Sequence, residues 1–419
     1  MTSILQALSC ADDYDPDSLT VERAAALVLD LVETVPGCER SFIRNGLNRV
    51  LAEDVIAPLD VPAHDNSAMD GYAVRYADLA AAGETQLGVA GTAYAGRAYA
   101  GAVGPGQAVR IMTGAVMPQG LDTVVIQEVV RVEGEHIVVP AGQRQGQHRR
   151  HAGEDLRAGQ AALGAGKLLR PAEIGLLASL GVVEVSLHRR LRVAMFSTGD
   201  ELCSLGRELG EGEVYDSNRY SLSSMLTRLG CEVLDMGVVR DQPEVLEKAL
   251  LEAAACSDAI VTSGGVSAGE ADFIRAMMAK LGEVAFWKIA MKPGRPLAFG
   301  KIGSAWLFGL PGNPVAVMVS FYQFVRPALM RMMGRQATAL PRFRVPCAVD
   351  LKKAPGRTEY LRGQLFEEDG VWRVRPTGAQ GSGILRSMAD ADCFIVLEHA
   401  RRNVAAGDMV DVQVMEGLV

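Results

Sequence analysis

Residues 191–201 read LRVAMFSTGDE, a mostly apolar run that ends in a glycine turn and two acids. Such a run, bounded by turn residues, predicts a strand. Residues 217–230 (SNRYSLSSMLTRLG) predict a helix ended by its final glycine, and residues 231–239 (CEVLDMGVV) predict the next strand. A helix is predicted at 242–256, with Asp241 as its N-cap. This alternation of strand and helix decides the fold.

The same alternation continues to residue 334. It predicts a strand at 258–265, a helix at 270–282, strands at 284–290 and 304–310, and a long apolar helix at 313–334 that contains Pro327. Strands that alternate with helices of 10–15 residues imply a parallel, doubly wound sheet. The middle of the chain is therefore predicted to be an α/β domain.

The flanking segments have different periods. Residues 20–34 and 170–181 have the apolar spacing and end signals of helices. Residues 59–151 change to short strands and glycine turns, which predict a compact β module. The last 80 or so residues again contain short strands, which predict a small barrel or sandwich. Three changes of pattern thus give about four structural units.

Composition excludes several classes of protein. The chain has 419 residues, 49% of them hydrophobic, and its 42 basic and 50 acidic residues give a net charge of −8, which argues against a general nucleic-acid binder. No apolar run reaches membrane-spanning length, and the N-terminus lacks the features of a signal peptide. The seven cysteines are dispersed without a C-x-x-C pair, which favours reduced thiols in the cytoplasm over a zinc site or disulfide framework.

The candidate ligand-binding residues of the α/β domain lie at the ends of its predicted strands. Ligands bind outside the carboxyl ends of strands in open parallel sheets. Four such ends carry polar or glycine-rich turns, at residues 197–201, 240–241, 263–267 and 310–314. Glycine turns at the starts of helices expose backbone N–H groups, which favour phosphate binding. Any one of these turns, taken alone, is more often an ordinary loop. No P-loop or dinucleotide-binding glycine motif is present, so ATPase and NAD-dependent functions lose support.

Three further segments are candidates. Residues 287–296 (WKIAMKPGRP) hold three cations after a predicted strand, with two prolines and a glycine that restrict the backbone around them, and Lys292 and Arg295 could bind an oxyanion. Residues 65–73 (DNSAMDGYA) place two carboxylates five positions apart in a turn. Residues 147–155 join a basic run to two acids. His148 and His151 have a spacing that metal ligands can adopt, but ordinary loop histidines are the preferred interpretation because no third His or Cys is nearby.

Seven motifs occur in an order and spacing that resemble the molybdopterin molybdenumtransferases, the molybdenum insertase family that includes the C-terminal domain of gephyrin. They are DNSAMDGYA (65–73), RIMTGA (110–115), GED (153–155), STGDEL (197–202), SGGVSAGEAD (263–272), KPGRP (292–296) and LPGNP (310–314). The resemblance covers the chain from about residue 15 to its end. One departure is Arg295, where the family often has Lys; the cation is kept.

The resemblance implies a multidomain α/β and β architecture. Its expected parts are a discontinuous N-terminal helical domain (15–58 with 152–187), an inserted β domain (59–151), a doubly wound molybdopterin-binding α/β domain (188–336) and a C-terminal β barrel (337–419). Members of the family are elongated homodimers. Their active site is a cleft between the α/β domain of one subunit and the N-terminal β parts of the other, so distant segments could serve one site.

The reaction implied by the resemblance converts adenylylated molybdopterin and molybdate into molybdenum cofactor and AMP, with Mg²⁺ required. The expected catalytic residues are Asp65, Thr113, Asp155, Glu201, Asp241 and Asp272, of which Glu201 and Asp241 would hold the metal. The expected substrate-binding residues are Arg150, Ser263, Gly264, Gly265, Ser267, Lys288, Lys292, Arg295, Pro311 and Pro314, with Arg362 and Ser382 as further candidates.

Two alternatives stay open. A molybdopterin adenylyltransferase shares the α/β domain, but it normally lacks the long N-terminal part and the C-terminal barrel, and usually has Thr where this chain has Val266. The other alternative is a non-catalytic cofactor carrier or scaffold, which could tolerate loss of the acids, yet all of them are present. An adenylyltransferase and molybdoenzymes are possible partners; nucleic acid and membranes are not expected.

Overall fold

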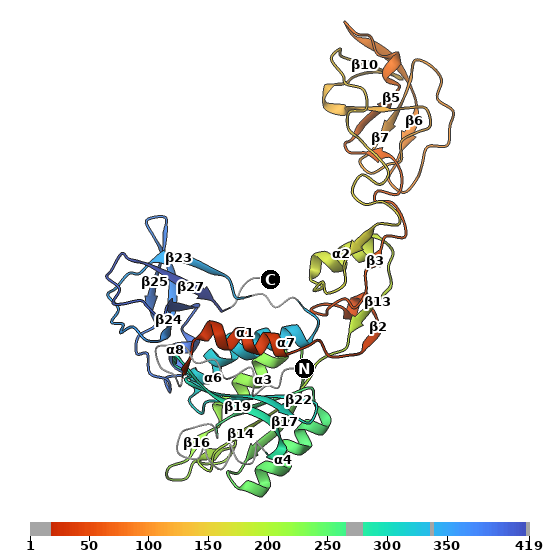
Figure 1. The fold of residues 1–419 in the computed structure, drawn as a ribbon. Helices are drawn as coiled ribbons and strands as arrows, with labels where there is room; N and C mark the ends of the chain where they lie inside the picture. The colour runs from red at the N-terminus through yellow and green to blue at the C-terminus, as the bar shows by residue number, and fades with distance from the viewer. Residues whose placement is uncertain (1–17, 265–279, 336–338, 416–419) are drawn as a thin grey trace.

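The computed structural model describes residues 18–264, 280–335 and 339–415. Figure 1 shows an extended molecule in which an α/β unit and a C-terminal β unit lie together, while a second β unit stands apart at the end of a narrow connecting region. Among the described residues, no helix is both long and apolar enough to cross a membrane.

The α/β unit is built on a central sheet of seven strands within the described part of the chain. Their spatial order is β1 (Ser18–Leu19), β19 (Gly282–Ile289), β21 (Pro296–Ile302), β22 (Ala305–Leu310), β18 (Ala259–Ser263), β14 (Arg192–Thr198) and β17 (Glu232–Val239). The last four strands in this order are parallel neighbours, as the sequence pattern predicts. Each of the four follows the expected boundaries within a few residues.

Strand β21 corrects the prediction of a wholly parallel sheet. It runs antiparallel to both of its neighbours, β19 and β22. The six residues between β19 and β21 are too few for a crossover, which needs about a dozen residues or more. The KPGRP segment therefore turns the chain back, and the doubly wound sheet is mixed at this edge.

Helices cover both faces of the sheet. They are α1 (Val21–Leu31), α3 (Ser217–Leu229), α4 (Pro243–Cys256), α6 (Pro314–Ser320) and α7 (Arg326–Met332). Val193 and Met195 of β14 lie in the core beneath α1, α3, α6 and α7, whereas Ala194 and Phe196 face the core beneath α4. This alternation explains why the strand is apolar at almost every position.

The helix ends follow local chemistry, with two corrections. Gly230 adopts a left-handed conformation (φ 94°) and ends α3 as predicted. The N-cap of α4 is Gln242, so the prediction of Asp241 as its cap was wrong. The predicted helix 313–334 is interrupted by a π-helical turn at Phe321–Val325, just before Pro327, because proline cannot donate the hydrogen bond that a regular helix requires. Most of the predicted helix 270–282 lies outside the described residues.

The narrow connecting region is made from two distant segments of the chain. Strand β2 (Cys38–Phe42) pairs with β13 (Glu184–His188), and β3 (Val55–Ile56) pairs with β12 (Ala161–Leu163). Helix α2 (Pro171–Ser179) packs beside them. Residues 20–34 are predicted to belong to this unit, but β1 pairs with β19 and α1 packs against α7, so this segment lies on the α/β unit. The predicted domain boundaries themselves stay predictions.

Glu173 in the first turn of α2 gives the connecting region a predicted pH dependence. Its carboxylate accepts hydrogen bonds from the backbone and side chain of Arg170, at 3.0 and 2.9 Å, and lies 3.3 Å from Lys167 Nζ. These contacts, led by the Arg170 side chain, lower the pKa of Glu173 to about 2. Because the folded pKa is depressed, the stabilisation is present above about pH 4.5 and is lost as the pH falls toward 2.

Glu173→Gln should therefore destabilise this unit by about 2 kcal/mol at pH 7, the scale of a hydrogen bond to a charged group. The difference from wild type should shrink in unfolding experiments run below about pH 4. Glu184→Gln is the control in the same unit, because Glu184 makes only an exposed contact with Arg40 at 3.8 Å. A Glu173→Gln difference that does not change with pH would contradict this assignment.

The separate β unit contains a six-stranded sheet in the described residues. Its spatial order is β8 (Thr123–Ile126), β5 (Gly71–Val74), β7 (Gln107–Ile111), β6 (Thr85–Ala93), β10 (His136–Val139) and β9 (Arg131–Glu133). The short strands β4 (Asn66–Ser67) and β11 (Arg149–Arg150) pair at its base. Short 3-10 turns occur in this unit at Tyr76–Asp78 and Gln127–Val129, and in the connecting region at Ile43–Asn45. The predicted all-β character of 59–151 is confirmed.

The C-terminal unit is also a β structure, as predicted. Its described strands are β20 (Met291–Lys292), β24 (Thr358–Glu368), β26 (Cys393–Leu397), β27 (Met409–Val414), β23 (Arg342–Pro346) and β25 (Val371–Pro376), with the short helix α8 (Arg386–Ala389). An isolated backbone β-bridge between Cys347, just after β23, and Val374 of β25 connects the two edges of this sheet. Closure into a full barrel stays a prediction.

Candidate functional site

Three loops meet at the carboxyl edge of the central sheet. Ser197 and Ser263 are register partners at the ends of β14 and β18, and both are buried. Gly264 has a φ of +92°, and a Cβ placed on it would lie 2.3 Å from the carbonyl oxygen of Thr198. Gly312, after β22, lies next to Gly264, because a Cβ placed on Gly312 would be in ordinary van der Waals contact with the Gly264 Cα, at 3.9 Å. Glycine is therefore required at 264, where the loops after β14 and β18 touch.

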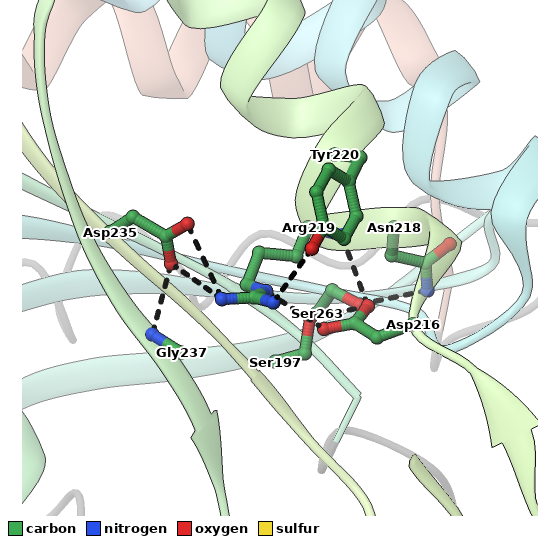
Figure 2. Close-up of polar contacts among 8 residues, drawn as sticks. All are labelled: Ser197, Asp216, Asn218, Arg219, Tyr220, Asp235, Gly237 and Ser263. Carbon is green, nitrogen blue, oxygen red and sulfur yellow. Dashed lines mark hydrogen bonds and ion pairs between the residues drawn. The ribbon is translucent and has the colours of Figure 1, made fainter. Parts of the chain in front are cut away.

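The first turn of α3 joins these strand ends with buried polar side chains (Figure 2). Asp216 is the N-cap of α3 and accepts a hydrogen bond from Ser197 Oγ at 3.0 Å. Asn218 donates through Nδ2 to Ser263 Oγ at 2.9 Å and to the Gly312 carbonyl at 2.6 Å. Sequence reasoning missed both residues. The signal was available in the DSN tripeptide at 216–218, which opens a helix directly after a strand-end loop.

Two of the predicted acids lie at this edge. Glu201 is exposed in the turn after β14, and its carboxylate folds back over Gly199, where an added Cβ would lie 2.6 Å from Oε2. Asp241 follows β17 and is partly buried. Because β14 and β17 are parallel neighbours, the two acids follow adjacent strand ends. Within the described ranges, no group of three or more His, Cys, Asp or Glu side chains forms a complete metal site.

The predicted cations lie where the α/β unit meets the C-terminal unit. Lys288 is exposed in β19, and Arg295 is exposed in the turn before β21. Lys292 belongs to β20, which pairs with β24 of the C-terminal sheet. Its Nζ lies 3.7 Å from the buried carboxylate of Glu359. The cation segment is thus anchored to two sheets, which supports the predicted held geometry.

The loop 310–314 is also fixed from both sides. Pro314 begins α6, and its neighbour Val315 donates a backbone hydrogen bond to the Ser382 carbonyl at 3.0 Å. Pro311 is buried in the turn between β22 and this helix. The predicted candidate Ser382 therefore lies beside this loop.

Arg362 does not reach the surface of the site. It is 1% exposed, and its guanidinium donates to Ser387 Oγ and the Gly381 carbonyl, both at 3.0 Å. Burial lowers its pKa to about 10. In this structure the Arg362 side chain supports the loop that carries Ser382, and its expected contact with substrate stays a prediction.

Four predicted residues lie in the separate β unit. Asp65 accepts a hydrogen bond from the backbone N–H of Ala152 at 2.7 Å and contacts the Arg149 guanidinium, and these partners lower its pKa. Thr113 donates through its backbone and side chain to Asp70, both at 2.7 Å, which lowers the pKa of Asp70. The other two, Arg150 and Asp155, are exposed.

The structure does not bring this group to the strand edge of the same chain, because the two units stand apart in Figure 1. Their expected approach from a partner subunit stays a prediction. The predicted residues Gly265, Ser267 and Asp272 lie outside the described residues. His148 and His151 lie in the separate unit, and the described residues there form no metal cluster.

Comparisons with known proteins agree with this architecture. Three family profiles match in order: "MoeA N-terminal region (domain I and II)" at residues 19–181, "Probable molybdopterin binding domain" at 194–331, and "MoeA C-terminal region (domain IV)" at 344–415.

Relatives match across the full architecture. The molybdopterin molybdenumtransferase of Haemophilus influenzae is 43% identical over 94% of this chain and 98% of its own length, and that of Nostoc is 37% identical over 88% and 86%. The crystal structure of a molybdopterin biosynthesis MoeA protein from Pyrococcus horikoshii has a TM-score of 0.82 at 28% identity, covering 95% of this chain and 100% of that one. The chain therefore belongs to the molybdopterin molybdenumtransferase family, a family of transferases.

Proposed function

We propose that this chain inserts molybdenum from molybdate into adenylylated molybdopterin and releases AMP. The observation that carries the proposal is the junction of the Ser197, Ser263 and Gly312 loops, which lies beside Glu201 and Asp241 at the carboxyl edge of the sheet. Ligands bind at this edge in open α/β sheets. The site therefore combines close backbone approach with carboxylates, as a phosphorylated pterin and a metal require.

The carboxylates Glu201 and Asp241 fit Mg²⁺ by their chemistry. Magnesium is bound in proteins through one or two carboxylates, with phosphate oxygens and waters completing its shell. Two acids that follow adjacent strands supply this small number of carboxylate ligands. Among the described residues, no group of three or more His, Cys, Asp or Glu side chains could hold a metal ion by itself. When bound there, the ion would neutralise charge on the phosphates during cleavage of the pyrophosphate bond.

The cations supply the second part of the site. Lys288, Lys292 and Arg295 would hold the molybdate dianion or a substrate phosphate through charge-assisted hydrogen bonds. Lys292 Nζ lies 3.7 Å from the buried carboxylate of Glu359 on the neighbouring sheet, and this ion pair favours one direction for the lysine side chain. Such reactions depend mostly on positioning and charge neutralisation, so anchored cations are well suited to them.

We assign Asp65, Thr113, Arg150 and Asp155 to the site of a partner subunit. Within one chain they lie in the separate β unit, and an elongated homodimer would place them across the strand edge of the other copy. Asp65 and Thr113 are already held by local hydrogen bonds, so their geometry would not need to form on association. We place the reaction in the cytoplasm, because the six described cysteines are free thiols.

The direct test uses purified protein with adenylylated molybdopterin, molybdate and Mg²⁺. The expected result is stoichiometric AMP release and a product that activates an apo-molybdoenzyme. ATP-dependent adenylylation of molybdopterin would instead identify an adenylyltransferase, and tight cofactor binding without turnover would identify a carrier. No AMP release in the presence of Mg²⁺ would overturn the proposal.

A further inference from the structure

The N-cap and first turn of α3 make side-chain contacts to three consecutive strand ends of the sheet, two of which, at Ser197 and Ser263, are seen in Figure 2. Asp216 accepts a hydrogen bond from the Ser197 hydroxyl at the end of β14. Asn218 donates to Ser263 at the end of β18 and to the Gly312 carbonyl after β22. Strands β14, β18 and β22 are neighbours in the sheet. A single helical turn therefore fixes the spacing of three loops that the proposed function assigns to substrate.

Arg219 extends the same connection to a fourth strand. Its Nη1 lies 3.3 and 3.4 Å from the two carboxylate oxygens of Asp235 in β17, and its Nε lies 3.4 Å from Asp216 Oδ2. Asp235 in turn accepts the backbone N–H of Gly237 at 2.9 Å. The four strands that this turn contacts, directly or through their loops, are the four adjacent parallel strands of the sheet.

Asn218 has the most constrained role among these residues. The residue is 7% exposed, and Nδ2 uses its two hydrogens on two different loops. These two bonds fix which end of the carboxamide faces the loops, because only the nitrogen can donate. Ser263 Oγ accepts from Asn218, so the serine keeps its own hydrogen to donate elsewhere. The Asn218 amide thus sets the distance between the Ser263 and Gly312 loops and the direction in which the Ser263 hydroxyl donates.

We propose that Asn218 is a positioning residue for the pterin substrate, acting through the Ser263 hydroxyl and the Gly312 loop. The inference rests on the proposed function, which places the substrate at these loops. Asn218 holds groups that bind the substrate in both its ground state and its transition state. Loss of such uniform binding raises KM and leaves kcat nearly unchanged.

The decisive variant is Asn218→Asp, which keeps the size of the side chain and removes the donor. An oxygen would then face the Gly312 carbonyl at the position of the present 2.6 Å bond, and a second carboxylate would lie in the turn of the buried Asp216. We expect KM for adenylylated molybdopterin to rise at least tenfold, with kcat within about twofold of wild type. Asn218→Ala should change KM in the same direction.

Ser224→Ala is the matched control. Ser224 lies on the same helix, is exposed, and donates only to the Tyr220 carbonyl one turn earlier, at 2.8 Å. It should leave KM and kcat unchanged. Circular dichroism and thermal unfolding of each variant separate a change in substrate binding from a loss of folded protein.

A second variant keeps the test decisive if Asn218 variants fold poorly. Ser263→Ala removes the acceptor and leaves Asn218 bonded to Gly312, so KM should rise by a smaller factor. Combining Ser263→Ala with Asn218→Asp should give less than the sum of the two single effects, because both remove one shared bond. Additive effects would overturn the positioning role.

The outcomes also separate this inference from the proposed function. If wild type releases AMP and Asn218→Asp has the KM of wild type, the positioning role is wrong and the proposed function stands. If Asn218→Asp lowers kcat with KM unchanged, the residue acts on the reacting atoms and the inference is also wrong. If wild type neither binds adenylylated molybdopterin nor releases AMP, the proposed function has failed, and the positioning role fails with it.

Discussion

Glu201→Gln is expected to reduce AMP release at least about a hundredfold, the usual scale for removing one electrostatic group that acts in the transition state. The glutamine has nearly the same size as the acid but carries no charge with which to bind a divalent cation. Glu201 is exposed after β14, so its replacement disturbs no core packing. AMP release measured by chromatography, together with Mg²⁺ binding by calorimetry, checks both parts of this expectation.

Glu211→Gln is the control for this variant. Glu211 is exposed in the same loop region, ten residues further along, and changes the net charge by the same amount. It should leave AMP release and Mg²⁺ affinity unchanged. Full activity of Glu201→Gln with an unchanged thermal midpoint would show that the central acid of the site has been assigned wrongly.

Gly264→Ala should have the second large effect, a loss of substrate binding of at least about tenfold, equivalent to about 1.4 kcal/mol. The new methyl group would lie 2.3 Å from the Thr198 carbonyl oxygen and 2.9 Å from Thr198 Oγ1, so the two strand-end loops must separate. The φ of +92° adds backbone strain for any side chain with a Cβ. Equilibrium binding of molybdopterin measures the result.

Gly303→Ala separates the clash from the backbone strain. Gly303 also has a positive φ, of 58°, but an added Cβ would meet no atom within 4 Å. It lies between β21 and β22, at the opposite end of the strand from the Gly312 loop. This variant should lose about 1 kcal/mol of stability and retain full substrate affinity. Equal loss of affinity in both variants would contradict the role of the Gly264 contact.

The secondary structure of the α/β unit could be predicted because its signals are local. The apolar run at 191–197 and the helix ended by Gly230 both depend on a few neighbouring residues. Strand β21 (Pro296–Ile302) was not predicted, because its place and antiparallel direction depend on how the short KPGRP turn returns the chain to the sheet. The place of α1 was also missed, since only its packing on α7 decides which unit it joins.

Some residues of the candidate site could likewise be found from the sequence, and others could not. Glycine turns and acids at strand ends could be found from sequence because parallel strands end at one edge of the sheet. Asp216 and Asn218 were missed because a cap residue and a site residue look alike in a helix-start sequence. The burial of Arg362 could not be predicted from sequence, because only the folded C-terminal unit encloses its guanidinium.

The sequence alone determined the order of most strands and helices of the α/β unit, the polar strand ends and the family resemblance, because each depends on motifs of residues close together along the chain. Only the tertiary structure decided that one turn of α3 connects Ser197, Ser263 and Gly312, and that Lys292 reaches Glu359 on another sheet. These contacts join residues far apart in sequence. They form only when burial brings the strands together and requires their polar groups to find partners.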